Sequence, residues 1–133
     1  MSTTQPIRSK QLLHDFKEYF LTKQPNSRNY TLILIGLNTA LRINDILHLT
    51  WGDVYCTEHS RFYTHLLITE KKTEKETRIL INRELQETLL SYRKTQPSIA
   101  DTDYLFPSPR KADSPLSRYQ AYRIVRKAAE AVG

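Results

Sequence analysis

The stretch Asn-Thr-Ala-Leu-Arg-Ile-Asn-Asp-Ile-Leu-His-Leu-Thr-Trp-Gly-Asp-Val-Tyr, residues 38–55, decides how this chain folds. Its first residues belong to the segment 28–41, which is apolar on nearly every side and predicts a helix at the centre of a bundle. Gly36 within that segment is expected to permit a close helix crossing. Apolar residues at i, i+3 and i+4 predict a second, short amphipathic helix over residues 43–49. Arg42 therefore stands at the break between two helices.

Two β-rich segments follow this stretch. Residues 62–69 and 77–81 are rich in β-branched and aromatic side chains and flank the charged loop Glu-Lys-Lys-Thr-Glu-Lys-Glu, residues 70–76. This pattern predicts a β-hairpin whose polar tip is longer than a two-residue turn. Residues 51–54 are expected to lead from the helices into this sheet.

The rest of the chain is mainly helical in pattern. Residues 9–21 carry apolar side chains at helical spacing, and Asn26 or Ser27 can cap the helix that follows. Asn82 can cap a helix over residues 83–94.

The last part of the chain is a loop followed by a helix. Pro, Ser and Asp dominate residues 95–116, interrupted by the extended segment 104–106. A final helix over residues 117–132 places four side chains on its apolar face: Tyr122, Val125, Ala129 and Val132. The elements together predict an α+β, mainly α-helical domain over residues 9–133, a helical bundle with a small antiparallel sheet, after a flexible tail of residues 1–8.

The composition narrows the class of protein. At 133 residues and 15.6 kDa, with 39% hydrophobic residues, the chain can bury one core. It has no signal peptide and no apolar run of the roughly 18 residues that a membrane span needs, so we expect no membrane association. A lone Cys56 is typical of a reducing cytoplasm, and the scattered histidines give no metal-site spacing.

The charge favours a polyanionic partner. The net charge is +6, and the excess is uneven: residues 1–60 hold six Lys and Arg against five Asp and Glu, whereas residues 61–133 hold fourteen against nine.

Arg42 is the candidate site residue that chemistry suggests. Its planar guanidinium can donate two hydrogen bonds to phosphate oxygens and, held rigidly, can stabilise the charge that develops during phosphoryl transfer. Asp45 lies three residues on, on the same helical face, where it can orient Arg42 or pair with it. The alternative is an ordinary surface Arg–Asp pair, which contributes about 0.3–0.5 kcal/mol.

Residues 36–54 resemble the signature of the tyrosine recombinase (phage integrase) family. The shared pattern is a helix end rich in small residues, then Leu-Arg-Ile, a small polar residue, an acid, aliphatic residues and Trp-x-Asp. The resemblance covers roughly residues 8–133 and implies part of a recombinase catalytic domain, truncated at its C-terminus. It implies that Arg42 is the first of two arginines that hold the scissile phosphate, with Asp45 as a supporting residue where many members have Glu.

The resemblance also implies a lysine at the hairpin tip. Such a lysine protonates the leaving 5′-oxygen as a general acid. Lys72 matches this position best, with Lys71 and Lys75 as alternatives and as further DNA contacts. The other interpretation is a solvated turn that discourages pairing at the sheet edge.

Basic residues near the C-terminal end are candidate DNA contacts. They can neutralise phosphates, although a charged surface is often merely solvated. These residues are Arg110, Lys111, Arg123, Arg126 and Lys127, with Arg118 among them in sequence. The segment Asp-Tyr-Leu-Phe-Pro-Ser, residues 103–108, also resembles a segment of the family.

Part of the family pattern is absent from the sequence. The family completes its site with His-x-x-Arg, a later His or Trp and a nucleophilic tyrosine. None of the four histidines begins His-x-x-Arg, and none of the eight tyrosines follows such a motif, Tyr119 and Tyr122 included. We therefore expect no nucleophilic tyrosine within this chain, and we expect these 133 residues to leave no room for the core-binding domain that usually precedes the catalytic one.

The resemblance implies a function for the parent protein. It would be a site-specific recombinase or integrase of a phage or mobile element that cuts and rejoins duplex DNA through a 3′-phosphotyrosyl intermediate. The family implies a tetrameric synapse and a cytoplasmic enzyme that needs no metal, cofactor or small-molecule substrate. Two alternatives are a non-catalytic remnant or regulator that binds DNA or a recombinase, and an unrelated helical DNA-binding protein.

Overall fold

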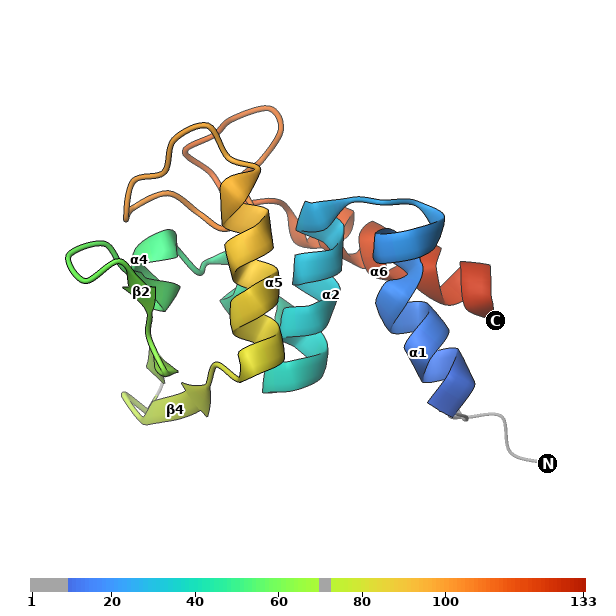
Figure 1. Ribbon diagram of the computed structural model, residues 1–133, viewed down its shortest axis with the longest axis horizontal. Helices are drawn as coiled ribbons and strands as arrows, with labels where there is room; N and C mark the ends of the chain where they lie inside the picture. Colours follow the sequence, from blue (N-terminus) through green and yellow to red (C-terminus); the bar gives the residue numbers. More distant parts are fainter. Residues whose placement is uncertain (1–9, 70–72) are drawn as a thin grey trace.

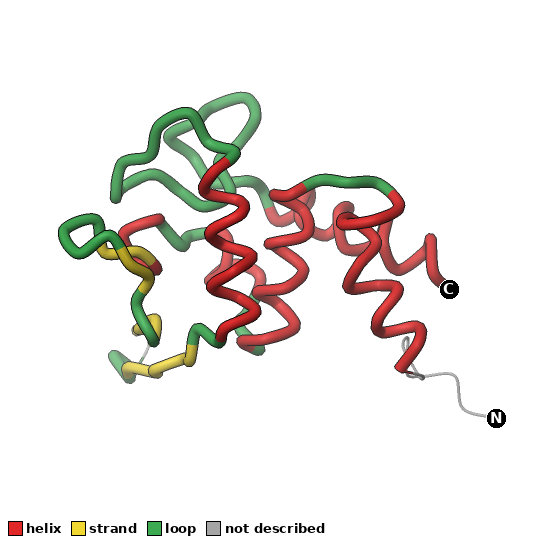
Figure 2. The backbone as a smooth tube through the Cα atoms, in the orientation of Figure 1, coloured by secondary structure: helices red, strands yellow, loops and turns green. Residues whose placement is uncertain are grey.

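The computed structural model describes residues 10–69 and 73–133, which are mainly helical (Figures 1 and 2). Its helices are α1 (Lys10–Glu18), the short π-helix η1 (Tyr19–Lys23), α2 (Ser27–Thr39), α3 (Ile43–Leu47), α4 (Trp51–Val54), α5 (Arg83–Lys94) and α6 (Arg118–Val132). Its strands are β1 (Tyr55–Cys56), β2 (Arg61–Phe62), β3 (His65–Thr69) and β4 (Glu76–Leu80). Helix α2 lies between α5 on one side and α1 and α6 on the other, with the strands beyond α5 (Figure 1). The predicted fold class is confirmed.

Helix α2 is the central element, as predicted. Residues 32–35 are each at most 4% exposed, because other elements cover the helix on all sides there. Asn26 caps its start by accepting a hydrogen bond from the Asn29 backbone N at 3.0 Å. The expectation for Gly36 was wrong: a Cβ there would meet Ile46 Cδ1 at 4.0 Å, an ordinary contact, so the packing does not require glycine.

Helix α1 buries less than its pattern predicts. It ends at Glu18 and continues as η1. Phe16 and Phe20 are buried, whereas Leu13, one of the apolar residues at helical spacing within residues 9–21, is 43% exposed.

The β region is divided into two sheets. The residues predicted as one strand over 62–69 form parts of β2, which pairs with β1, and β3, which pairs with β4 along its whole length. Residues 51–54 form the helical turn α4 instead of leading straight into a strand. The reason is local, because Asp53 Oδ2 accepts hydrogen bonds from the Thr50 backbone N at 2.9 Å and hydroxyl at 3.1 Å. The predicted hairpin is confirmed in β3 and β4.

The loop over residues 95–116 is tied to the connection between α3 and α4. Leu105 N donates to Leu49 O at 3.0 Å, and Trp51 N donates to Asp103 O at 2.9 Å. Two distant parts of the chain are thereby joined through their main chains.

Helix α5 packs against this loop. It spans the predicted residues, and Asn82 caps it by accepting a hydrogen bond from Leu85 N at 2.9 Å. Leu105 and Phe106 are fully buried, and the Tyr92 hydroxyl donates to Leu105 O at 2.5 Å. Burial raises the pKa of Tyr92 to about 12.

Helix α6 packs with a face other than the predicted one. Its buried residues are Ala121, Ile124 and Ala128. Tyr122, predicted on the inner face, is 52% exposed, whereas Val125, Ala129 and Val132 are only partly buried against the core. The helix thus has two adjacent apolar faces, and the one with smaller side chains lies innermost.

Candidate functional site

Arg42 lies in the short connection between α2 and α3. The chain leaves α2 through Ala40, whose φ of 55° places it in the left-handed region, and Leu41 N then donates to Thr39 Oγ1 at 3.3 Å. Arg42 is the N-cap residue of α3, and its carbonyl accepts a hydrogen bond from Ile46 N at 3.1 Å. Its backbone is therefore held at both ends, while its side chain is exposed.

Two hollows open beside Arg42. One has a volume of about 540 Å³ and lies toward α6, lined by Arg42, Ile43, Asn44, Asp45, Arg118 and Tyr122. The other, about 590 Å³, lies toward the hairpin. Its lining from the helices is Thr39, Ala40, Leu41, Arg42, Asn44 and Asp45, and from the hairpin Ile68, Thr69, Thr73, Thr77 and Ile79. Arg42 thus stands on the ridge between them.

Asp45 lines both hollows with Arg42. Within the described part of the chain, no carboxylate lies within 4.0 Å of the Arg42 guanidinium, that of Asp45 included. Among the described residues, the Arg42 guanidinium therefore has no carboxylate partner, and its position beside two hollows suits an anionic ligand.

The lysines of the hairpin are only partly covered by the structure. Lys71 and Lys72 lie outside the described residues. Thr69 and Thr73 are the nearest described residues on either side of them, and both line the hollow between Arg42 and the hairpin. Lys75 is exposed, and its backbone N donates to Thr73 Oγ1 at 3.2 Å.

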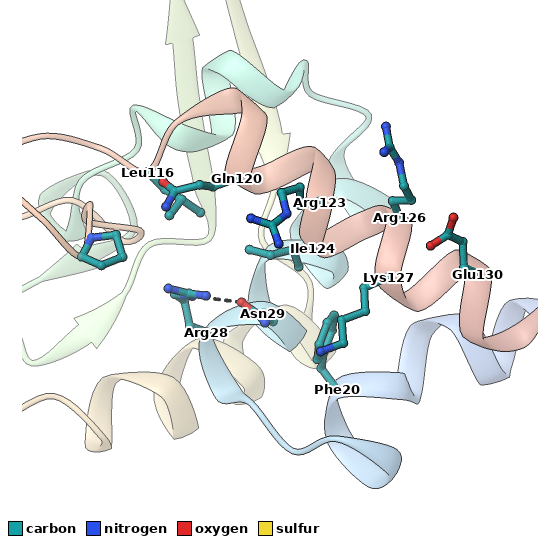
Figure 3. Close-up of a pocket in the computed structure, with 11 residues that line it drawn as sticks. Phe20, Arg28, Asn29, Leu116, Gln120, Arg123, Ile124, Arg126, Lys127 and Glu130 are labelled. Atoms are coloured by element: carbon teal, nitrogen blue, oxygen red, sulfur yellow. Dashed lines mark hydrogen bonds between the residues drawn. The ribbon is translucent and has the colours of Figure 1, made fainter.

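The other predicted basic residues do not gather at Arg42. Arg110 and Lys111 are exposed in the loop before α6. Arg123, Arg126 and Lys127 line a third hollow, between α6 and the start of α2 (Figure 3). The six basic residues of this region, Arg118 included, therefore divide among separate surfaces.

Of these basic residues, Arg118 is the one that lines a hollow beside Arg42, the hollow on the side of α6. It is the first residue of α6 and lines that hollow together with Tyr122. Helical geometry in the sequence contained this signal: at about 100° per residue, Arg118 and Tyr122 share a face that Arg123 and Lys127 do not.

Neither a metal site nor a membrane-spanning helix is seen in residues 10–69 and 73–133. No cluster of His, Cys, Asp and Glu side chains there could hold a metal ion. No helix there is long and apolar enough to cross a lipid bilayer.

Sequence comparison finds two matches. A family model described as "Phage integrase family" matches residues 5–133. The protein named "Probable integrase/recombinase YoeC", from Bacillus subtilis (strain 168), is 43% identical over 133 residues, which are 100% of this chain and 67% of that protein.

Structural comparison finds the same fold in larger proteins. The crystal structure of XerA recombinase matches with a TM-score of 0.77 at 21% identity, covering 100% of this chain and 44% of that one. Lambda integrase, residues 75–356 bound to DNA, matches with a TM-score of 0.64 at 16% identity, covering 94% of this chain and 42% of that one. The chain thus spans less than half of each of these two solved chains.

Proposed function

The chain belongs to the phage integrase family, and from this premise we propose that it contributes the first part of the active site of a DNA strand-exchange enzyme. The enzyme would cut and rejoin duplex DNA at specific sites, in the cytoplasm. The observation that carries the proposal is the position of Arg42, exposed on the ridge between the hairpin and α6 with no carboxylate partner among residues 10–69 and 73–133.

Arg42 would bind the scissile phosphate. Its guanidinium can donate hydrogen bonds to both nonbridging oxygens, and its backbone is fixed by the end of α2 and the start of α3. A donor held in this way stabilises the pentacoordinate transition state without reorganising during the reaction. Asp45, on the wall of both hollows, would limit the positions that the arginine can take.

Lys72 would act on the leaving group. A tyrosine hydroxyl attacks phosphorus and releases its proton to solvent or to a nearby base, the bond from phosphorus to the 5′-oxygen breaks, and the departing oxygen takes a proton. The ammonium of Lys72, with Lys71 and Lys75 as alternatives, would donate that proton. The phosphodiester energy stays in the phosphotyrosyl bond, so rejoining requires no nucleotide.

Duplex DNA would lie against the surface that carries Arg42. Lambda integrase has been solved on DNA, and as a tetramer bound to a Holliday junction, so we propose DNA as partner and a multimer as the working form. Arg118 would contact the phosphates beside the scissile one, with Lys75, Arg110 and Lys111 farther out.

A second candidate function follows from the sequence. The chain has no His-x-x-Arg motif, so the nucleophile and the second arginine would have to come from polypeptide outside these 133 residues. Where none is supplied, the same surface would bind DNA or an intact recombinase without cutting.

A nicked DNA substrate that traps the covalent intermediate tests both candidates. In the complete gene product, we expect Arg42→Ala to lower formation of the protein–DNA adduct at least about 100-fold, with duplex binding largely retained. Lys94→Ala, on the exposed end of α5, serves as the matched control. An unchanged adduct yield in Arg42→Ala would contradict the catalytic role, and DNA binding without any adduct in the unaltered protein would favour the second candidate.

A further inference from the structure

The hollow between α2 and α6 has a lining unlike that of the hollows beside Arg42. Its volume is about 540 Å³. Its cationic lining residues are Arg28, Arg123, Arg126 and Lys127, and the rest are Phe20, Asn29, Pro109, Leu116, Gln120, Ile124 and Glu130. Figure 3 shows Arg28 from α2 and Arg123 from α6 reaching toward one another across the space.

Positive charge exceeds negative charge in this hollow, which is lined by four cations and by one carboxylate, that of Glu130. None of its four cations has a carboxylate within 4.0 Å among the described residues; Arg28 Nε donates to the amide oxygen of Asn29 at 2.9 Å instead. Arg123 and Lys127 are also four residues apart on one helix, a spacing at which like charges repel. Glu130, three residues after Lys127 and four after Arg126, offsets part of this repulsion, and an anionic ligand would offset more of it.

The floor of the hollow is apolar. Phe20 and Leu116 are each 2% exposed and Ile124 is 9% exposed, so they present edges of the core rather than whole side chains, and Pro109 adds an exposed apolar ring. The phosphate groups of DNA would pair with the cations but would not cover such a floor. A peptide that alternates acidic and aliphatic or aromatic side chains satisfies both the floor and the cations.

The hollow also lies away from the surface proposed for DNA. Arg123 and Lys127 lie about 140° around the axis of α6 from Arg118 and Tyr122, at roughly 100° per residue. A duplex against Arg42 would therefore leave the hollow open to a second molecule.

We propose that this hollow is a docking site for an acidic, apolar peptide segment of a partner protein. The acidic side chains pair with Arg28, Arg123 and Lys127, and one apolar side chain rests on Ile124 and Phe20. Such a site would attach a protein partner to the recombinase while its DNA surface is occupied.

The test is a binding titration of the chain with a fluorescent amphipathic peptide of about four helical turns, containing Glu with Leu and Phe. We expect Arg123→Glu with Lys127→Glu to weaken binding about tenfold to a hundredfold, because two attractive pairs become repulsive. Arg28→Gln should weaken it less. Lys23→Glu with Lys94→Glu changes the net charge equally on exposed positions outside the hollow, and should bind like the unaltered chain.

Three outcomes would overturn the proposal. One is that the peptide does not bind, or binds the altered hollow equally well. Another is that a peptide with Ser in place of Leu and Phe binds as tightly, which would make the hollow a general polyanion surface. The third is that a short duplex DNA loses as much affinity as the peptide in Arg123→Glu with Lys127→Glu. Unchanged thermal unfolding of each variant shows that the fold is retained.

Discussion

The junction at Arg42 and the hollow at Arg123 both present arginines that have no carboxylate partner in the described part of the chain, but they differ in what surrounds the charge. Arg42 lies on a fixed backbone between two hollows, one shared with Arg118 and Tyr122 and one whose walls carry four threonines. The hollow gathers four cations from two helices over an apolar floor. Net charge alone would assign both regions to one polyanion, whereas the surroundings favour a phosphate at the first and a peptide at the second.

The largest expected effect concerns the rigidity of the Arg42 region. Ile46 is 2% exposed and anchors α3, so Ile46→Ala should lower the free energy of unfolding by about 2–5 kcal/mol. Urea unfolding measures this, with Leu67→Ala as control, since Leu67 is 54% exposed and should cost under about 0.5 kcal/mol. Equal losses in the two variants would mean that α3 is not anchored as described.

A smaller effect tests the core that separates the two regions. The pKa of Tyr92 is raised to about 12 in the folded chain, above the roughly 10 of an unfolded tyrosine. Its contribution to stability is therefore complete below pH 10 and is lost as the pH rises toward 12, by about 2–3 kcal/mol in all. The free energy of unfolding, measured with urea between pH 9 and 12, should decline less steeply in Tyr92→Phe than in the unaltered protein. Parallel curves for the two proteins would contradict the burial of this hydroxyl.

The next prediction compares the contributions of the two basic regions to DNA binding. Arg42→Gln with Arg118→Gln should weaken binding to a short duplex about tenfold and reduce the slope of log affinity against log salt by about 1.8, as expected for two phosphate contacts. Arg123→Gln with Lys127→Gln removes the same charge and should leave that slope nearly unchanged. Equal slopes for the two double variants would show that both regions belong to one DNA-binding surface.

The smallest effect concerns the end of α2, which positions Arg42. Gly36 is helical with room for a methyl group, whereas Ala40 adopts φ 55°. Gly36→Ala and Ala40→Gly should therefore each stabilise the chain by up to about 1 kcal/mol. Thermal unfolding would show two upward shifts that add in the double variant, and a downward shift in either would contradict the local conformation.

Local patterns predicted the elements well. Helix α5 and its Asn82 cap depend on side chains close in sequence, and the apolar run of α2 could only be central. The inner face of α6 could not be predicted, because Val125 and Ala129 on one side and Ile124 and Ala128 on the other are both apolar. Only packing against α1 and α3 selects between them.

The candidate site was predictable in its residue types but not in its grouping. Arg42 was identifiable because its motif is continuous in sequence. Helical spacing places Arg118 and Arg123 on different sides of α6, but the hollow that each side faces depends on where α6 lies relative to α2 and α3, which no local pattern encodes.

The main-chain ties between Leu49 and Leu105 and between Trp51 and Asp103 have a kinetic consequence. They close a loop of about 56 residues that contains the hairpin and α5, and the entropy of that closure opposes their early formation. The helices can form first, with the ties completed late in folding. In the native protein, the amide hydrogens of Trp51 and Leu105 should then exchange with solvent together, in one opening that releases the loop over residues 95–116 from the core.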